Sequence, residues 1–303
     1  MPAVPRVRPD DQEATVTQLH AGPDVANLML GDFLRQCREE RGLKQLELGY
    51  AIRASVSKIS RLERGESPPR TRDVMDLADF MKLGRQERRT IERLLDQTRD
   101  GAWYQKFSDV TPTYLRRLIA LEGSAREIRT YENQVIPGVL QTREYAVSLA
   151  KTVKKDEREA ERVGEMRQER QVKLREARMQ RSLRLTALID EGVLLRPRGG
   201  HGVMREQLEY LLEQADVKRT NIRIVPFGCG ADVTPPYAVA QLDFPAQGPS
   251  DLVYVEHING ADYITRPDIV DKYRNDLHQL MVVAADRVES KRLIREAIKR
   301  YRS

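Results

Sequence analysis

The sequence predicts two domains: five helices come first, and an α+β domain with a small mixed sheet flanked by helices follows. Three observations predict this fold class. Apolar residues recur at helical spacing up to Gln97. After Leu185, short runs alternate at strand spacing between turn residues. The length of 303 residues also matches two domains of ordinary size.

The segment from Gln45 to Gly65 predicts two short helices joined by a tight turn. Leu48, Ala51 and Ile52 form the apolar face of the first helix, and Ile59 and Leu62 form the inward face of the second. This layout is typical of a helix-turn-helix, in which the second helix enters the DNA major groove.

The outward side chains of this pair are short hydroxyls and long cations, which suit phosphates and base edges. From Arg53 to Arg72, six cations face two anions, whereas the whole chain has a net charge of only +6. A helical bundle with a solvated basic face is the alternative, but the local charge favours double-stranded DNA as the partner. We expect Gln45 near a phosphate, and the predicted DNA contacts are Gln45, Ser55, Val56, Ser57, Lys58, Ser60, Arg61 and Arg64.

Three further helices are predicted around the pair. One contains Leu30 to Cys37 and ends near Gly42, one contains Val74 to Met81, and one contains Ile91 to Leu95. Five helices in about 70 residues can just bury a core of their own.

The segment from Leu28 to Gln97 resembles the five-helix DNA-binding domain of the phage-repressor-like, xenobiotic-response-element family. The run from Ser57 to Gly65, SKISRLERG, carries most of the resemblance. Gly49 stands where the family usually has Ala, and Arg53 stands where its turn usually has Gly. A left-handed backbone at Arg53 would therefore be strained.

Residues 1–24 are rich in proline and charged side chains, a composition that predicts a disordered tail. We expect the helix-turn-helix domain at 25–97 and the α+β domain at 98–303. No signal peptide or membrane span is expected. Cys37 and Cys229 are too few for a disulfide framework or a zinc site. We expect a cytoplasmic, nucleoid-associated protein.

In the second domain, we expect helices around Tyr114 to Leu121, over the charged stretch Asp156 to Arg184 and over Val203 to Ala215. Strands are predicted at 222–227, 238–244 and 252–256, before a late helix around Tyr273 to Met281 and a basic helix at 290–301.

This region also resembles the C-terminal domain of WhiJ-type regulators from actinomycetes. The matching strings include VIPGVLQT at 135–142, IVPF at 224–227 and VYVE at 253–256. The resemblance implies a transcriptional regulator, often paired with a small protein encoded beside it. A homodimer is expected, because one small domain buries too little surface to select a site in a genome.

The charged stretch carries an excess of basic residues, so it is a candidate surface for a small acidic partner protein. The expected partner-binding residues are Met166, Arg170, Leu174, Arg175 and Arg178. The alternative is that this helix packs within the second domain.

An enzyme and a small-molecule sensor are the other function classes considered. The run from Gly199 to Gly202 could hold an anion at a helix start, although a tight turn explains it better. Glu256 and His257 end a predicted strand. An apolar cavity near Trp103, Phe227 and Tyr254 would favour a sensor. A cluster of titratable side chains with shifted pKa values would favour an enzyme. No catalytic residue, metal site or cofactor is predicted.

Overall fold

The computed structural model describes residues 23–98, 103–154, 156–180, 183–228, 234–246, 248–258 and 260–301. The predicted tail at 1–24 lies outside the described residues except for its last two positions, and Cys229 also lies outside them.

The N-terminal part is a bundle of five helices, as predicted. They are α1 (Pro23–Glu40), α2 (Gln45–Ala51), α3 (Val56–Glu63), α4 (Thr71–Phe80) and α5 (Arg85–Gln97). Their shared core is built from the apolar positions that the helical spacing indicated, among them Leu34, Leu48, Ile59, Leu77 and Ile91, each fully buried. Burial of this stripe from every helix holds the bundle together.

The turn between α2 and α3 is tight at two positions. Arg53 has a φ of 52°, so the left-handed conformation considered from the sequence is present on a non-glycine residue. Gly49 is buried, and a Cβ there would lie 2.7 Å from the carbonyl oxygen of Ala54. Glycine at 49 therefore lets the turn pack closely against α2.

The C-terminal part contains a six-stranded mixed sheet in the order β3-β2-β1-β4-β5-β6. The first three strands pair in parallel, and β4, β5 and β6 continue the sheet antiparallel. The strands are β1 (Glu127–Glu132), β2 (Arg184–Asp190), β3 (Thr220–Val225), β4 (Val239–Asp243), β5 (Leu252–His257) and β6 (Gly260–Ile264).

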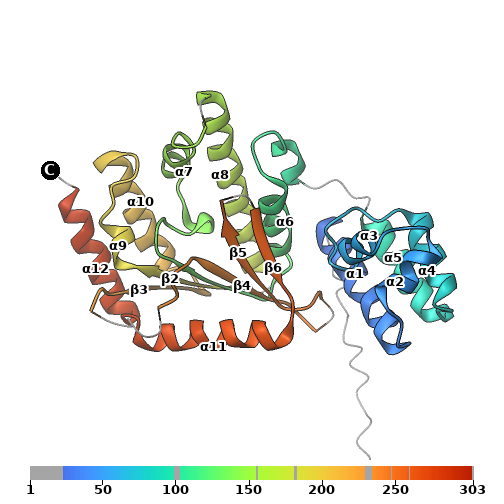
Figure 1. The fold of residues 1–303 in the computed structure, drawn as a ribbon. Helices are drawn as coiled ribbons and strands as arrows, with labels where there is room; N and C mark the ends of the chain where they lie inside the picture. Colours follow the sequence, from blue (N-terminus) through green and yellow to red (C-terminus); the bar gives the residue numbers. More distant parts are fainter. Residues whose placement is uncertain are drawn as a thin grey trace, which may run out of the picture.

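Helices cover both faces of the sheet (Figure 1). On one face, α11 packs on the cluster that includes Val225, Val239 and Val253. The other face carries the largest core and most of the remaining elements. The non-strand elements are η1 (Trp103–Phe107), α6 (Thr113–Glu122), η2 (Gly138–Leu140), α7 (Arg143–Ala150), α8 (Glu157–Gln180), α9 (Glu191–Leu194), α10 (Gly200–Ala215), α11 (Pro267–Val283) and α12 (Arg287–Arg300).

The α+β class is confirmed, but the sheet is larger than the strand pattern indicated. The three strands predicted from alternation correspond to β3, β4 and β5. Strand β1 was not predicted, because its residues EIRTYE are mostly polar, although it lies inside the sheet between β2 and β4. Strand identity at β1 is set by pairing on both edges, which local propensity does not report.

The helical bundle contacts the C-terminal part through α1. Val25, Ala26 and Leu28 belong to the core of the sheet domain, where α1 packs on α6. The backbone N–H of Ser250 donates to Asp32 in α1 at 3.3 Å.

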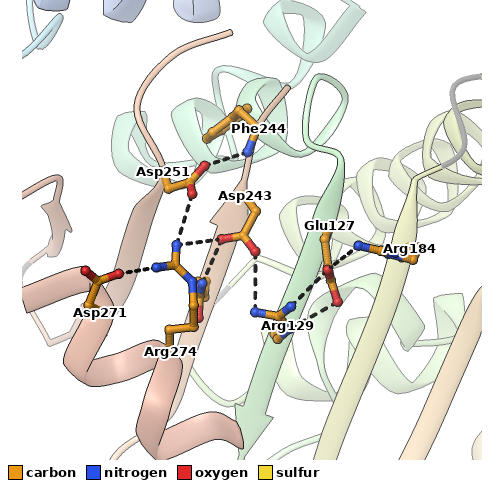
Figure 2. Close-up of polar contacts among 9 residues, drawn as sticks. Glu127, Arg129, Arg184, Asp243, Phe244, Asp251, Asp271 and Arg274 are labelled. Atoms are coloured by element: carbon orange, nitrogen blue, oxygen red, sulfur yellow. Dashed lines mark hydrogen bonds and ion pairs between the residues drawn. The ribbon is translucent and has the colours of Figure 1, made fainter. Parts of the chain in front are cut away.

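A network of ion pairs on the α11 face of the sheet includes Asp251, the residue after Ser250 (Figure 2). Asp243 of β4 faces Arg129 of β1 and Arg274 of α11, each at 3.4 Å. Arg274 also pairs with Asp251 at 3.0 Å, and Asp251 accepts from the N–H of Phe244 at 2.8 Å. Because each of these charges has a partner, we interpret the network as structural.

Candidate nucleic-acid interface

Helix α3 is the predicted recognition helix, and its start is well defined. Ser55 is the N-cap, and its hydroxyl accepts from the backbone N–H of Lys58 at 3.2 Å. Ile59, Leu62 and Glu63 face inward and are buried. The side chains at the opposite spacing are therefore directed outward.

The outward face of α3 carries the predicted contact residues. Their spacing places them on a single face of the helix: Val56, Ser57, Ser60, Arg61 and Arg64. Val56 is 41% exposed, and Ser57, Arg61 and Arg64 are also exposed. The hydroxyl of Ser60 accepts from Arg64 at 2.6 Å, which holds the two side chains together.

A buried carboxylate supports this helix from behind. Glu63 is 2% exposed and accepts from Arg38 of α1 at 2.6 and 3.0 Å. The hydrogen bond to Glu63 is the main cause that raises the pKa of Arg38 above its usual value. Gln45, which we expected near a phosphate, donates its side-chain amide to Glu63 at 2.8 Å. In this conformation the amide of Gln45 joins α2 to α3.

The basic residues around α3 divide into paired and unpaired groups. Lys58 pairs with Asp73 of α4 at 2.6 Å, and Arg64 pairs with Glu66 at 2.6 Å. Within the described ranges, ion pairs are absent at three exposed arginines of this region: Arg53, Arg61 and Arg70. Their charges are the ones most available to an external anion.

A hollow of about 360 Å³ lies beside the recognition helix. Its wall joins α3 to the start of α4 through Lys58, Arg61 and Arg70, with the Pro68–Pro69 turn between them. Asp73 also lines it and pairs with Lys58, so the three cations face one carboxylate. Cations around a concave surface concentrate positive potential, and a phosphate backbone has the complementary charge.

The residues predicted as a partner surface require a correction. Met166, Arg170, Leu174 and Arg178 are between 1% and 7% exposed, and Arg175 alone of the five is exposed. Their helix α8 packs on α7 and η2, so the alternative, packing within the second domain, is confirmed. The basic excess over 156–184 is also small, nine cations against seven anions. Four of the five residues are therefore interior and cannot contact a partner protein from this position.

The glycine run at 199–202, considered as an anion site, is explained by close packing. The glycines at 199 and 200 have φ values of 76° and 88° and form a tight turn between α9 and α10. A Cβ at Gly199 would overlap the Ser148 side chain, so close packing explains this glycine. In the described part of the chain, no group of three or more His, Cys, Asp or Glu side chains is arranged to hold a metal ion.

Of the three residues near which an apolar cavity would favour a sensor, one lines a cavity in the structure. Tyr254, Glu256 and His257 line a cavity on the sheet, whereas Trp103 and Phe227 do not. Phe227 is 67% exposed, and Trp103 packs against Tyr104 and Phe107. Glu132 and Arg167 also line this cavity and were not predicted, because residues so far apart in sequence meet only in the folded chain.

Two family models match the chain. A helix-turn-helix domain model matches residues 29–91, which contain α2, α3 and α4. A model described as a domain of unknown function (DUF5753) matches residues 115–296, more than half of the chain. The chain belongs to this DUF5753 family. No curated protein and no solved structure gave a significant match.

The helix-turn-helix match, together with the charged outer face of α3, supports a DNA-binding regulator. The DUF5753 match assigns no chemistry to the C-terminal domain. Among the described helices, none combines the length and apolar character that crossing a bilayer requires.

Proposed function

We propose that the protein is a sequence-specific transcriptional regulator in which α3 lies in the DNA major groove. The observation that carries this proposal is the outer face of α3, where Ser57 and Arg61 are exposed and Arg61 has no ion pair among the described residues. Arginine contacts guanine through two parallel hydrogen bonds, which is the commonest specific contact in the major groove.

Arg61 and Lys58 have different roles in this proposal. Arg61 reads a base edge, whereas Lys58, already paired with Asp73, exchanges that partner for a phosphate. Arg53 and Arg70 flank α3 and add phosphate contacts, which position the helix without reading sequence. Ser55, Ser57, Ser60, Val56 and Arg64 complete the contact face, and Gln45 supports it through Glu63.

Selection of duplexes from a random library by the full chain tests the proposal. Arg61→Ala should cost about 1–3 kcal/mol on the selected duplex and relax the preference at one base pair. Lys58→Ala should weaken all duplexes evenly and reduce the salt slope by about one. Arg93→Ala, at an exposed position in α5, is the matched control with the same loss of charge. If Arg61→Ala binds like that control, the groove assignment is wrong.

We also propose that the protein binds DNA as a homodimer on two half-sites related by a dyad. The size of a single five-helix domain supports this, because specific interfaces usually need more buried surface than one such module supplies. Analytical ultracentrifugation of the protein, free and on a selected duplex, measures the stoichiometry. A monomer in both states contradicts the dimer.

Control by a small acidic partner encoded nearby remains a proposal that rests on the resemblance to WhiJ-type regulators. Four of the residues first expected to bind this partner, Met166, Arg170, Leu174 and Arg178, are interior and do not support it. Co-purification from the host, with mass spectrometry of the bound proteins, tests whether such a partner exists. Recovery of no specific small protein contradicts it.

A further inference from the structure

The C-terminal domain contains a cavity of about 540 Å³. Its floor is the sheet face formed by β1, β4 and β5, and its walls are α6, α8 and the segment around η2. The lining is mixed: polar and charged side chains share it with apolar ones, among them Leu115, Leu118, Ile128, Val139 and Tyr254. The volume is in the range of small-molecule sites, and the apolar part of the lining can take the body of such a molecule.

Two arginines of α8 enter the cavity one helical turn apart. A Cβ at Gly138 would lie 2.6 Å from Nη1 of Arg167 and 2.9 Å from Nη1 of Arg170. Both guanidinium groups therefore lie in space that a side chain at position 138 would fill. Any larger residue at 138 would displace at least one of them.

The two guanidinium groups differ in their partners. Arg170 forms a bidentate ion pair with Glu122, with hydrogen bonds of 2.7 and 2.5 Å, and both side chains are almost fully buried. Arg167 has a buried Nε without a hydrogen-bond partner, and it forms no ion pair within the described part of the chain. Burial, followed by the charge of Arg170, lowers the pKa of Arg167 to about 10. The cavity thus contains a cation without a contacting counter-charge.

A second donor lies in the same cavity. Burial, followed by the charge of Glu256, raises the pKa of Glu132 to about 8. At neutral pH the Glu132 carboxyl is mostly protonated and can donate a hydrogen bond. Glu256 accepts from the hydroxyl of Tyr254 at 2.8 Å. Arg167 and Glu132 therefore both offer donors, which match the oxygens of an anion.

The cavity is connected to the recognition helix by α6. Leu115, Leu118 and Glu122 of α6 line the cavity, while α6 also packs on α1. On the same helix, Arg117 donates to the carbonyl of Arg64, the C-cap residue of α3, at 2.5 Å.

An aromatic contact continues this connection. The guanidinium of Arg117 stacks over the ring of Tyr263 at 4.4 Å, and Tyr263 contacts the cavity residue Tyr254 at 5.2 Å between ring centres. The Tyr263 hydroxyl also donates to the carbonyl of Tyr114 at 2.5 Å. A ligand that moves Tyr254 or α6 would therefore change contacts at the end of α3.

We propose that this cavity is a regulatory site for a small molecule with an apolar body and one anionic group, which contacts Arg167 and is sensed by α3 through α6. The binding site stands on the cavity itself, whereas the regulatory role rests on the proposed DNA-binding function. To shift DNA binding, the ligand must favour one arrangement of α6 over another.

Calorimetry on the full chain without DNA tests the site. The probes are octanoate and 4-phenylbutyrate, and octanamide and 4-phenylbutanamide are their uncharged controls. At least one acid should bind about tenfold more tightly than its amide, which corresponds to about 1.4 kcal/mol for a charged contact. Arg167→Gln should remove that preference and Arg167→Lys should retain part of it. Arg175→Gln, an exposed change on the same helix, should leave it intact.

The proposed site is wrong if neither acid binds better than its amide, or if Arg167→Gln leaves the preference unchanged. Thermal unfolding of each variant shows that a lost preference is not a lost fold.

Anisotropy with a selected duplex tests the connection. The acid that binds should change the affinity for the duplex at least threefold in the unmodified protein, and Arg117→Gln should abolish this change while calorimetry still detects the acid. An unchanged affinity in the presence of bound acid refutes the connection through α6. Failure to select any duplex refutes the DNA-binding function alone, because acid binding is measured without DNA.

Discussion

Replacement of Glu63 by Gln tests whether the buried carboxylate behind the recognition helix holds the helix-turn-helix together. The carboxylate accepts two hydrogen bonds from Arg38 and one from Gln45, and it is 2% exposed. The Arg38 side chain is 11% exposed, so the variant leaves a nearly buried guanidinium whose remaining carboxylate partner is Glu39, which is 57% exposed. Breaking a buried ion pair on one side costs about 3–5 kcal/mol. Because Gln keeps one acceptor oxygen, we expect a loss of about 3 kcal/mol.

Glu66→Gln is the matched control, since it removes the same charge three residues away. Glu66 pairs with Arg64, and these side chains are 35% and 49% exposed. Exposed pairs contribute about 0–1 kcal/mol, so this variant should unfold almost like the original protein.

Hydrogen exchange of peptides from α1 and α3, read by mass spectrometry, is the assay. It reports local opening of these helices, whereas Trp103 fluorescence reports the C-terminal domain. Protection in α1 and α3 should fall in Glu63→Gln and stay nearly constant in Glu66→Gln. Equal losses in the two variants would refute the reasoning, because burial would then have no effect on the strength of the pair. The double variant Arg38→Met with Glu63→Leu should recover part of the loss by removing both charges.

Three other changes have expected signs. Arg53→Gly should raise the free energy of unfolding by up to about 1 kcal/mol, because glycine adopts the observed positive φ without strain; chemical denaturation measures it. The raised pKa of Glu132 means that the folded state holds a proton which the unfolded state loses, so stability falls as pH rises from 4.5 through about 8. Glu132→Gln should flatten that slope in thermal melts, by a few kcal/mol at most since the side chain is half-buried. Arg170→Gln should lower the melting temperature by leaving Glu122 unpaired, whereas Arg167→Gln should not; equal effects would contradict the assigned pairing.

The sequence by itself determined the helical bundle, because each helix there is amphipathic and its signals are local. Apolar spacing placed Leu48, Ile59 and Leu62 inside and left Ser57 and Arg61 outside. Helix formation and capping depend on residues within a few positions of one another, so reading along the chain was enough. The alternating runs of β3, β4 and β5 were readable for the same reason.

The tertiary structure alone decided the features that depend on distant residues. The polar sequence of β1 becomes a central strand only because β2 and β4 pair with its edges. Arg170 and Arg178 are cations in the sequence and were assigned to a surface, yet the fold buries them, Arg170 beside Glu122 and Arg178 beside Thr220. The mixed charges of α8 gave no clear apolar stripe, so periodicity could not show which side of the helix faces inward. The cavity at Arg167 and its connection to α3 likewise exist only where β1, β5, α6 and α8 meet, because burial and pairing are properties of the packed chain.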